Sequence, residues 1–426
     1  MKILIVCPFF PPKNEIASQR PYSWAKYWTM DGHDVTVLTV EYAKESCDLT
    51  YDLNGFNIIR VKDTVPGRTC LNSVKGHTDD TVPIAKKIFA TFVSAVKRPY
   101  VKFVEPTGCL IGNNFPNFLD IWAKKAIQEV CNDHWDFVIS TGGPYCVHRV
   151  GLYLKSHGQA DRWCVDWRDL WTRNYMAKGC FLFRGYEKKL ESKMHANADF
   201  ITTISDVDAD ILRTITETPV YTVYNGFDYD DMADILIKPR KANKRLTFLY
   251  AGTIYKGFRD PSPLLQAVSN LHKKKLITPE QIKLCFAGRN ADISDIIKDF
   301  QLDNYYSFLG YLPREKILEL QYDADILLFL EYGKESRALT AKIFEYLVLG
   351  KEIWAVGCTN STVAGKLIEN TNAGICFGTD VSLIENAIGT LLNQDKKERV
   401  KDFSKIDSFQ RKHQARQILT ILNEQN

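Results

Sequence analysis

Lys342 and Glu345 stand three residues apart inside an otherwise apolar run, residues 341–357 (AKIFEYLVLGKEIWAVG). The run predicts a buried helix that begins near Thr340, ends at Gly350 and leads into a buried strand. The first turn of such a helix offers free backbone N–H groups and the positive end of the helix dipole. It therefore favours an anion, and Lys342 would add a positive charge. The alternative is a solvent-exposed Lys342–Glu345 pair, worth roughly 0.2–0.5 kcal/mol.

Further cations follow predicted strands in the same half of the chain. After the predicted strand LTFLYAG, the loop GTIYKGFRDP carries Lys256 and Arg259, and Arg289 directly follows the predicted strand KLCFAG. Gly252, the first residue of the loop, would let an anion approach the backbone closely. The alternative for all three cations is that they are solvated surface charges.

The N-terminal half also carries charged side chains next to a predicted strand. The segment DWRDLW follows the strand RWCV, so Asp166, Arg168 and Asp169 should lie at or near a strand end. Their charges either position a substrate hydroxyl or close a salt bridge that shapes the loop. His148 in STGGPYCVH is a candidate contact for a substrate, with a structural role as the alternative, and Arg20 is a weaker candidate in the loop PPKNEIASQRP.

Composition excludes several classes of protein. The 426 residues are 45% hydrophobic and 25% charged, which fits a globular chain with a large core, and the net charge of +4 does not indicate a general attraction to nucleic acid. No D-x-D strand end or His/Cys cluster is placed to hold a divalent ion, because DADI (323–326) precedes an apolar strand. We therefore expect neither a metal nor a cofactor.

Apolar runs alternate with helical patterns along the whole chain, which predicts doubly wound α/β sheets. The cycle pauses near residue 225, at YNGFDYDD, and the basic stretch KPRKANKR (238–245) then leads into a new strand, LTFLYAG. A chain of this length exceeds one hydrophobic core, so we expect two domains, residues 1–235 and 246–400. Residues 401–426 are expected to form a C-terminal helix that packs back toward the N-terminal domain.

Four features of the sequence bear on the cell compartment and on membrane contact. Eleven cysteines without a C-x-x-C pair indicate free thiols and a reducing cytosol, and the N-terminal apolar run reads as a strand, not as a signal peptide. No run is long enough to span a membrane. Residues 84–103 predict a basic amphipathic helix that either contacts an anionic membrane or packs on its own domain.

Seven motifs in order give the chain a resemblance to the family 4 glycosyltransferases, and within them to the bacterial branch that builds capsule, O-antigen and other envelope polysaccharides. They are CPFFPP, GHDVTVLT (32–39), DWRDLW (166–171), YNGFD (224–228), YAGTIYKGFRDPSPLLQA (250–267), FAGR (286–289) and KIFEYLVLGK (342–351). The resemblance implies a GT-B fold, two Rossmann-like domains facing each other across a cleft. It also implies transfer of a sugar with retention, from a nucleotide diphosphate sugar and without an essential metal.

The resemblance assigns the donor to the second domain. Glu345 would accept hydrogen bonds from the ribose, while Thr340 and Lys342 would lie at the pyrophosphate. Lys256 and Arg259 would stabilise the departing diphosphate, helped by Gly252, Thr253 and Arg289 at the neighbouring strand ends.

The sequence departs from the family pattern at two positions. Thr253 stands where an arginine usually follows the glycine, and Arg337 stands where the first glutamate of the Glu, seven residues, Glu motif belongs. Glu335 and Glu331 are the nearest carboxylates. The donor sugar therefore stays open.

The expected partners are a nucleotide sugar and a lipid-linked glycan acceptor, bound by the first domain through Arg20, His148 and Asp166, with Arg168 and Asp169 near the reaction. The enzyme would be cytoplasmic and peripheral on the inner face of the cell membrane. Two other functions stay open: a sugar nucleotide epimerase of the same fold, and a non-catalytic member of an assembly complex that binds a sugar nucleotide or glycan.

Overall fold

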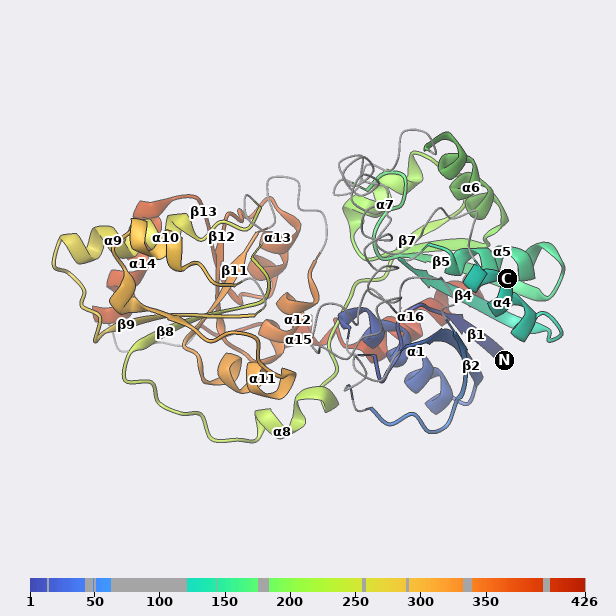
Figure 1. Ribbon diagram of the computed structural model, residues 1–426, viewed down its shortest axis with the longest axis horizontal. Coiled ribbons are helices and arrows are strands. Elements are labelled where there is room, and N and C mark those ends of the chain that lie inside the picture. Colours follow the sequence, from blue (N-terminus) through green and yellow to red (C-terminus); the bar gives the residue numbers. More distant parts are fainter. Residues whose placement is uncertain are drawn as a thin grey trace, which may run out of the picture. The chain divides into compact units, whose positions relative to one another are not determined.

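The computed structural model describes residues 1–13, 15–42, 49, 51–62, 121–143, 145–174, 184–254, 258–288, 291–331, 339–393 and 399–425. The chain forms two compact units, one of Met1–Val223 with Ala415–Asn426 and the other of Tyr224–Gln414 (Figure 1). The division therefore falls before residue 224, earlier than the basic stretch at 238–245 where the sequence placed it. The predicted amphipathic helix at 84–103 lies outside the described residues.

The first unit is built on a seven-stranded sheet in the order β3-β2-β1-β4-β5-β6-β7. Each described pair of neighbouring strands is parallel, and the strands are mostly buried along their length, as apolar runs of this kind require. The strands are β1 (Lys2–Val6), β2 (Asp34–Glu41), β3 (Asn57–Lys62), β4 (Trp135–Gly142), β5 (Ala160–Trp167), β6 (Phe200–Thr203) and β7 (Val220–Thr222).

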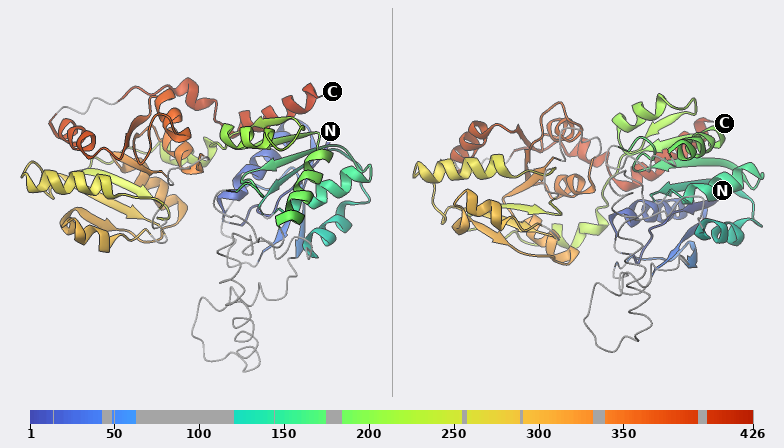
Figure 2. Two further views of the ribbon diagram at one scale, coloured as in Figure 1. Left: turned by 90° about the horizontal axis from the view of Figure 1, so that it is seen from above. Right: turned by 45° about the horizontal axis from the view of Figure 1, so that its top comes forward.

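Helices bury both faces of this sheet (Figures 1 and 2). One face packs against α4 (Ile121–Val130), α5 (Val147–Ser156), α6 (Arg184–Asn197) and α7 (Asp206–Arg213). The other packs against α1 (Gln19–Met30) and the C-terminal helix α16 (Arg411–Glu424).

The last turns of α16 are held in the first unit by polar contacts as well as by apolar packing. Trp28 donates a hydrogen bond to the carbonyl of Ala415, and Arg416 forms an ion pair with Asp31 at 2.6 Å. Ile418 and Leu422 enter the same core as α1.

The second unit contains a six-stranded parallel sheet in the order β10-β9-β8-β11-β12-β13. Apolar side chains from helices again cover both faces. The strands are β8 (Leu246–Ala251), β9 (Ile282–Ala287), β10 (Tyr306–Phe308), β11 (Ile326–Leu330), β12 (Glu352–Val356) and β13 (Gly374–Gly378). The helices are α8 (Ala233–Leu236), α9 (Ser262–Lys273), α10 (Ser294–Asp299), α11 (Arg314–Asp323), α12 (Ala341–Val348), α13 (Val363–Asn370), α14 (Val381–Asn393) and α15 (Phe403–Asp407).

Strand order reverses once in each sheet, and ligands of open α/β sheets bind beside that point at the carboxyl ends of the strands. In the first sheet the reversal lies between β1 and β4, and in the second between β8 and β11. The doubly wound architecture predicted from the alternation of patterns is confirmed. Two places in the molecule are thus favoured for ligands, one in each unit.

Candidate functional site

The switch point of the second sheet holds Lys342. This residue lies in the first turn of α12, the helix that follows β11, and its Nζ is 4.1 Å from the centroid of the Tyr250 ring on β8. A lysine over an aromatic face makes a cation–π contact. In the part of the chain that the structure describes, no carboxylate forms an ion pair with Lys342. Its charge is thus available to a ligand.

Two glycines follow the ends of adjacent strands, and one of them, Gly252, lies beside this ammonium. Gly252 has φ +145°, and a Cβ there would collide with Lys342 Nζ. Gly288, at the end of β9, has φ +134°, and a Cβ there would lie 2.5 Å from the carbonyl oxygen of Gly252. The sequence motif "AG" at both strand ends therefore has a steric reason.

Arg259 brings a second cation to this place. Its Nη1 donates to the carbonyl of Thr253 at 2.8 Å and lies 3.4 Å from the hydroxyl of Tyr250. The hydroxyl of Tyr250 donates to the same carbonyl at 2.9 Å. Arg259 and Lys342 therefore share Tyr250 as a neighbour, which brings together two of the predicted donor-site residues. Thr253 contributes its carbonyl oxygen to this arrangement.

Burial lowers the pKa of Lys342 to about 7, and the charge of Arg259 is the second cause of this shift. The charge of Glu345 acts in the opposite direction. Desolvation disfavours the charged amine, and the nearby guanidinium of Arg259 repels it. An anion bound between them would relieve both effects. This is the electrostatic signature expected of an anion site.

The helix α12 begins at Thr340, as the sequence predicts. The side chain of Thr340 makes no capping hydrogen bond. The N–H of Ile343 instead donates to the carbonyl of Thr340 at 3.1 Å, so what the first turn offers an anion beside Lys342 is the positive end of the helix dipole.

Glu345, one turn into α12, forms an ion pair with Arg314 at 2.6 Å. Arg314 is the first residue of α11, and the Glu345 carboxyl group is 13% exposed. Glu345 therefore pairs with Arg314 and not with Lys342, the i,i+3 partner that the sequence offered as an alternative. The ion pair instead fixes the position of its carboxylate.

Several predicted residues lie outside the described residues: Lys256, Arg289, Glu335 and Arg337. Glu331, the other carboxylate considered for the missing first glutamate, directly follows β11 and is buried. Its backbone N–H donates to the carbonyl of Val356 on the neighbouring strand.

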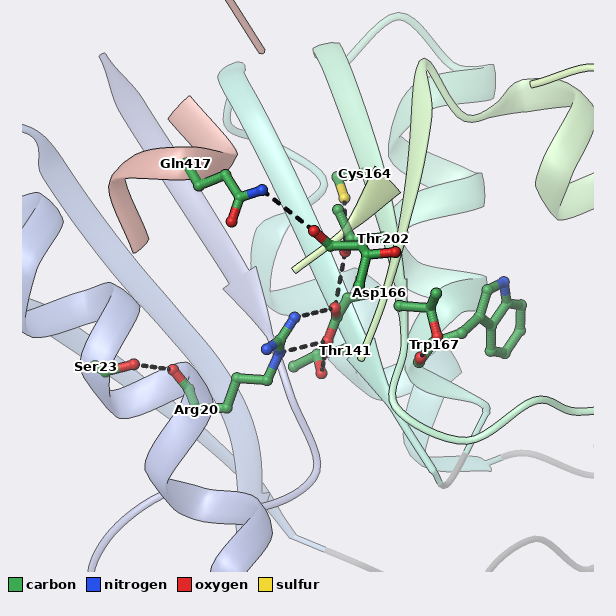
Figure 3. A network of polar contacts seen from close by, with 10 residues as sticks. Arg20, Ser23, Thr141, Cys164, Asp166, Trp167, Thr202 and Gln417 are labelled. Atoms are coloured by element: carbon green, nitrogen blue, oxygen red, sulfur yellow. Dashed lines mark hydrogen bonds and ion pairs between the residues drawn. The ribbon is translucent and has the colours of Figure 1, made fainter. Parts of the chain in front are cut away.

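In the first unit, the carboxyl ends of β4, β5 and β6 meet at a buried ion pair (Figure 3). Arg20 Nη2 lies 2.8 Å and Arg20 Nε 3.2 Å from the two oxygens of Asp166. Thr141 and Thr202 donate hydrogen bonds to the same carboxylate at 2.6 and 2.8 Å. Asp166 is 0% exposed and Arg20 3% exposed.

Burial opposes the ionisation of Asp166, but the charge of Arg20 and the hydrogen bonds from Arg20, Thr141 and Thr202 outweigh it and lower its pKa. The pair joins α1 to three strands. Because both side chains are enclosed, their direct role is structural: they tie α1 to β4, β5 and β6. Of the two roles considered for Asp166, positioning a substrate hydroxyl or closing a salt bridge, this supports the salt bridge.

The two other charges of DWRDLW differ from Asp166. Arg168 is half-buried and donates to the carbonyls of Ala17 at 3.2 Å and Gly143 at 3.4 Å. It therefore connects the loops that follow β1 and β4. Asp169 is exposed, so it remains accessible to a ligand of the first unit.

His148 is fully buried, and its Nδ1 lies 2.8 Å from the hydroxyl oxygen of Ser140. That oxygen also accepts a hydrogen bond from Trp163 Nε1, and the imidazole packs 4.3 Å from the Trp167 ring. Burial lowers the pKa of His148 to about 3. The structural alternative for this residue therefore fits its surroundings, and no solvent-accessible surface remains for an acceptor.

Sequence reasoning missed four residues that complete these arrangements: Tyr250, Arg314, Thr141 and Thr202. The threonines carry a readable signal, since each lies at the end of an apolar strand where a side chain meets the switch-point region. Arg314 carried none, because only folding brings α11 beside α12.

In the described part of the chain, no group of three or more His, Cys, Asp or Glu side chains is arranged to hold a metal ion. None of the described helices is long and apolar enough to cross a membrane.

No protein-family model and no curated protein sequence matches this chain. Solved structures do match over its whole length. Sucrose-phosphate synthase from Thermosynechococcus elongatus is 13% identical over 100% of this chain and 99% of its own, with a TM-score of 0.56. The lipopolysaccharide outer core galactosyltransferase WaaB is 11% identical over 100% of both chains, with a TM-score of 0.58. The UDP-GlcNAc 2-epimerase from Methanocaldococcus jannaschii is 12% identical over 100% of both chains, with a TM-score of 0.52.

At these identities the likeness concerns the fold. Together with the two parallel sheets, it confirms that the chain belongs to the GT-B fold class, with two Rossmann-like domains.

Proposed function

We propose that this chain is a retaining family 4 glycosyltransferase that moves a sugar from a nucleotide diphosphate sugar to a lipid-linked glycan acceptor in envelope polysaccharide synthesis. One observation carries the donor half of the proposal. Lys342 lies at the switch point of the second sheet, over Tyr250, near Arg259 and beside Gly252. The match to WaaB, a lipopolysaccharide galactosyltransferase by its name, supports the envelope role.

The chemistry follows from these charges. Breaking the bond between sugar and diphosphate leaves a negatively charged leaving group, whose stabilisation is the main electrostatic task of an enzyme without an essential metal. Lys342 and Arg259 would neutralise that charge, with Lys256 and Arg289 as further candidates and Gly252 and Thr253 lining the approach. Glu345, held by Arg314, would accept hydrogen bonds from the ribose.

The test is a thermal shift panel of UDP, GDP, TDP and CMP with their common sugars, on the wild type and on Lys342→Met. Ligand that binds only the native state raises the melting temperature. We expect one nucleotide diphosphate to stabilise the wild type and not the variant. Equal shifts in both proteins would remove Lys342 from the donor site.

The acceptor half needs a separate test. Incorporation of labelled sugar into lipid, in the presence of cell membranes, would support a lipid-linked acceptor and a peripheral, cytoplasmic enzyme. Replacement of Lys86, Lys87, Lys97 and Arg98 by Gln should release the protein from anionic vesicles if residues 84–103 contact lipid. Continued cosedimentation of the variant would rule out that contact.

The match to a UDP-GlcNAc 2-epimerase favours one second candidate, a sugar nucleotide epimerase. It would use the same donor site and need no acceptor. Conversion of a nucleotide sugar to its epimer without membranes, followed by NMR of the sugar protons, would support it. A non-catalytic protein would bind the nucleotide sugar and leave it unchanged in both assays.

A further inference from the structure

The second unit contains a basic cavity of about 370 Å³ that the donor site does not include. Four cations line it: Lys241, Lys244, Arg245 and Lys283. Arg245 precedes β8 and Lys283 is the second residue of β9, so the cationic end of the cavity lies at the amino ends of these strands, while Leu309 follows the carboxyl end of β10. Lys342 and Gly252 mark the opposite, carboxyl edge of the sheet. Three of the four cations belong to the stretch KPRKANKR (238–245), which contributes no residue to the donor site.

The charges of this basic cavity are not balanced. Among its lining residues the one carboxylate is Asp323, which lies 3.8 Å from Lys241. Arg245 makes a long hydrogen bond to the carbonyl of Pro279, at 3.4 Å. Within the described residues, no ion pair joins a carboxylate to Lys244 or Lys283. Glu280, outside the lining, also lies near Arg245: hydrogen bonds from Thr278 and its own backbone lower the pKa of Glu280, and the charge of Arg245 is a further cause. Among the residues that line the cavity, four positive charges therefore face one negative charge.

The floor of the basic cavity is apolar. Leu249 and Cys285, on the sheet face, are buried beneath it, and Leu309 and Leu320 add further apolar surface. Asn243 and Thr247 add polar groups to the lining. Cations above an apolar floor suit a ligand with an anionic head and an apolar body, because each part meets its complement. Lysine and arginine side chains are the usual partners of phosphate oxygens.

We propose that the basic cavity binds a phosphate ester with an apolar substituent. The phosphate lies among Lys244, Arg245 and Lys283, and the substituent lies on Leu249, Leu309 and Leu320. This chemistry has two sources, the headgroup region of an anionic phospholipid and a soluble phosphate ester. The proposal does not depend on the proposed glycosyltransferase activity.

Calorimetry with the full-length protein tests it, with inorganic phosphate, butyl phosphate and monomeric dihexanoyl phosphatidic acid as probes. We expect the two esters to bind more tightly than inorganic phosphate. The Arg245→Gln/Lys283→Gln variant should lose at least about tenfold in affinity, the loss that follows from removing charge-assisted hydrogen bonds. The matched control is Lys405→Gln, a surface lysine that pairs with Asp402 on α15. It should bind as the wild type does, and circular dichroism should show all three proteins folded.

Vesicles distinguish the two sources. Phosphatidylcholine vesicles with and without phosphatidic acid are sedimented with the wild type and with the Arg245→Gln/Lys283→Gln variant. Vesicle binding that the variant loses assigns the site to a bilayer lipid. Binding of the soluble esters alone assigns it to a soluble compound. Absence of binding in every arm, or binding that the double variant retains, overturns the proposal.

A separate observation concerns Cys358 and Cys376, whose Sγ atoms lie 3.9 Å apart. Cys376 is a half-buried residue of β13, and Cys358 is a buried residue that follows the end of β12. Both thiols are free. A disulfide needs its sulfur atoms at about 2.05 Å, so these two must approach each other before they can bond.

We infer that Cys358 and Cys376 form a reversible disulfide by exchange with a small-molecule disulfide. The half-buried Cys376 thiolate attacks one sulfur of the reagent and releases one thiolate. Cys358 then loses its proton and attacks Cys376 Sγ, which releases the second thiolate. The pKa of Cys376 is lowered, mainly by the hydrogen bond that Cys358 donates to it. This favours Cys376 as the first nucleophile.

Titration of the purified protein with oxidised glutathione, followed by mass spectrometry of peptides, tests this inference. We expect a peptide pair joined through Cys358 and Cys376, with the loss of two hydrogen atoms and reversal by dithiothreitol. Cys358→Ser should instead stop at a mixed disulfide of glutathione with Cys376. A wild type that stops at the same mixed disulfide, or does not react at Cys376, overturns the inference.

Discussion

The ammonium of Lys342 lies over the ring of Tyr250, 4.1 Å from its centroid, and Arg259 donates toward the hydroxyl of the same tyrosine. The aromatic ring thus holds two like charges near each other without neutralising either. A carboxylate in its place would form an ion pair and repel a diphosphate. Tyr250 therefore contacts both cations at the switch point of the second sheet, where the proposed function places the diphosphate.

Replacing Lys342 by methionine keeps most of the side-chain volume and removes the charge. If Lys342 contacts the diphosphate, the loss should be about 1.5–3 kcal/mol of binding free energy, roughly 10- to 150-fold in Kd. Calorimetry with the nucleotide that gives the largest thermal shift measures it. Lys274→Met, which removes a surface lysine paired with Glu385, is the matched control and should bind normally.

Affinity for a nucleotide sugar should also depend on pH, because the pKa of Lys342 is lowered to about 7 in the unliganded protein. A bound diphosphate favours the protonated amine. Binding should therefore be tightest below pH 7 and weaken as pH rises through that value, with uptake of a proton. Calorimetry in buffers of different ionisation enthalpy detects that proton. The diphosphate of a nucleotide sugar does not titrate here, so Lys342→Arg should flatten the profile. An unchanged profile in that variant would place the titrating group elsewhere.

Glu345→Gln should weaken nucleotide binding by about 1.5–3 kcal/mol if the carboxylate accepts hydrogen bonds from the ribose. Arg314 complicates the result, since loss of the ion pair also frees Arg314. Arg314→Met separates the two effects: it leaves the Glu345 carboxylate present but no longer held, and should cost less. Glu319→Gln, on the surface of α11, removes a comparable pair with Lys316 and should have no effect. Unchanged affinity in Glu345→Gln would refute the assignment to the ribose.

Much of the fold follows from local pattern, since apolar runs bounded by polar loops identify buried parallel strands regardless of what they pair with. Lys342 and Gly252 could be predicted because their positions relative to a helix start and a strand end are local properties. The partners of Glu345 and Asp166 could not. Arg314 is 31 residues from Glu345, and Arg20 is 146 residues from Asp166. Such pairings depend on which helix packs beside which strand, and a single sequence does not encode that directly.

Replacing one member of the buried Arg20–Asp166 pair should lower the free energy of unfolding far more than replacing both. Asp166→Asn leaves the Arg20 guanidinium buried without a counter-charge, and loss of one partner of a buried ion pair typically costs about 3–5 kcal/mol. The double variant Arg20→Met/Asp166→Leu removes both charges and should recover much of that loss. Urea unfolding followed by tryptophan fluorescence measures it. Asp161→Asn, at an exposed site on the same strand, should change little. A double variant as unstable as the sum of both single variants would contradict this account.

His195 should make the first unit sensitive to acid. It is 2% exposed, its Nε2 accepts a hydrogen bond from Trp167 Nε1, and burial lowers its pKa from 6.5 to about 4. The unfolded chain therefore binds a proton at His195 that the folded chain does not, between about pH 6.5 and 4. The stability that depends on neutral His195 is present above pH 6.5 and falls as pH drops, by up to about 3 kcal/mol.

His195→Gln keeps an acceptor for Trp167 and cannot titrate, so its free energy of unfolding should fall less steeply between pH 7 and 4.5. His157→Gln, at an exposed position, should keep the slope of the wild type. If His195→Gln also keeps that slope, the acid sensitivity arises from other groups.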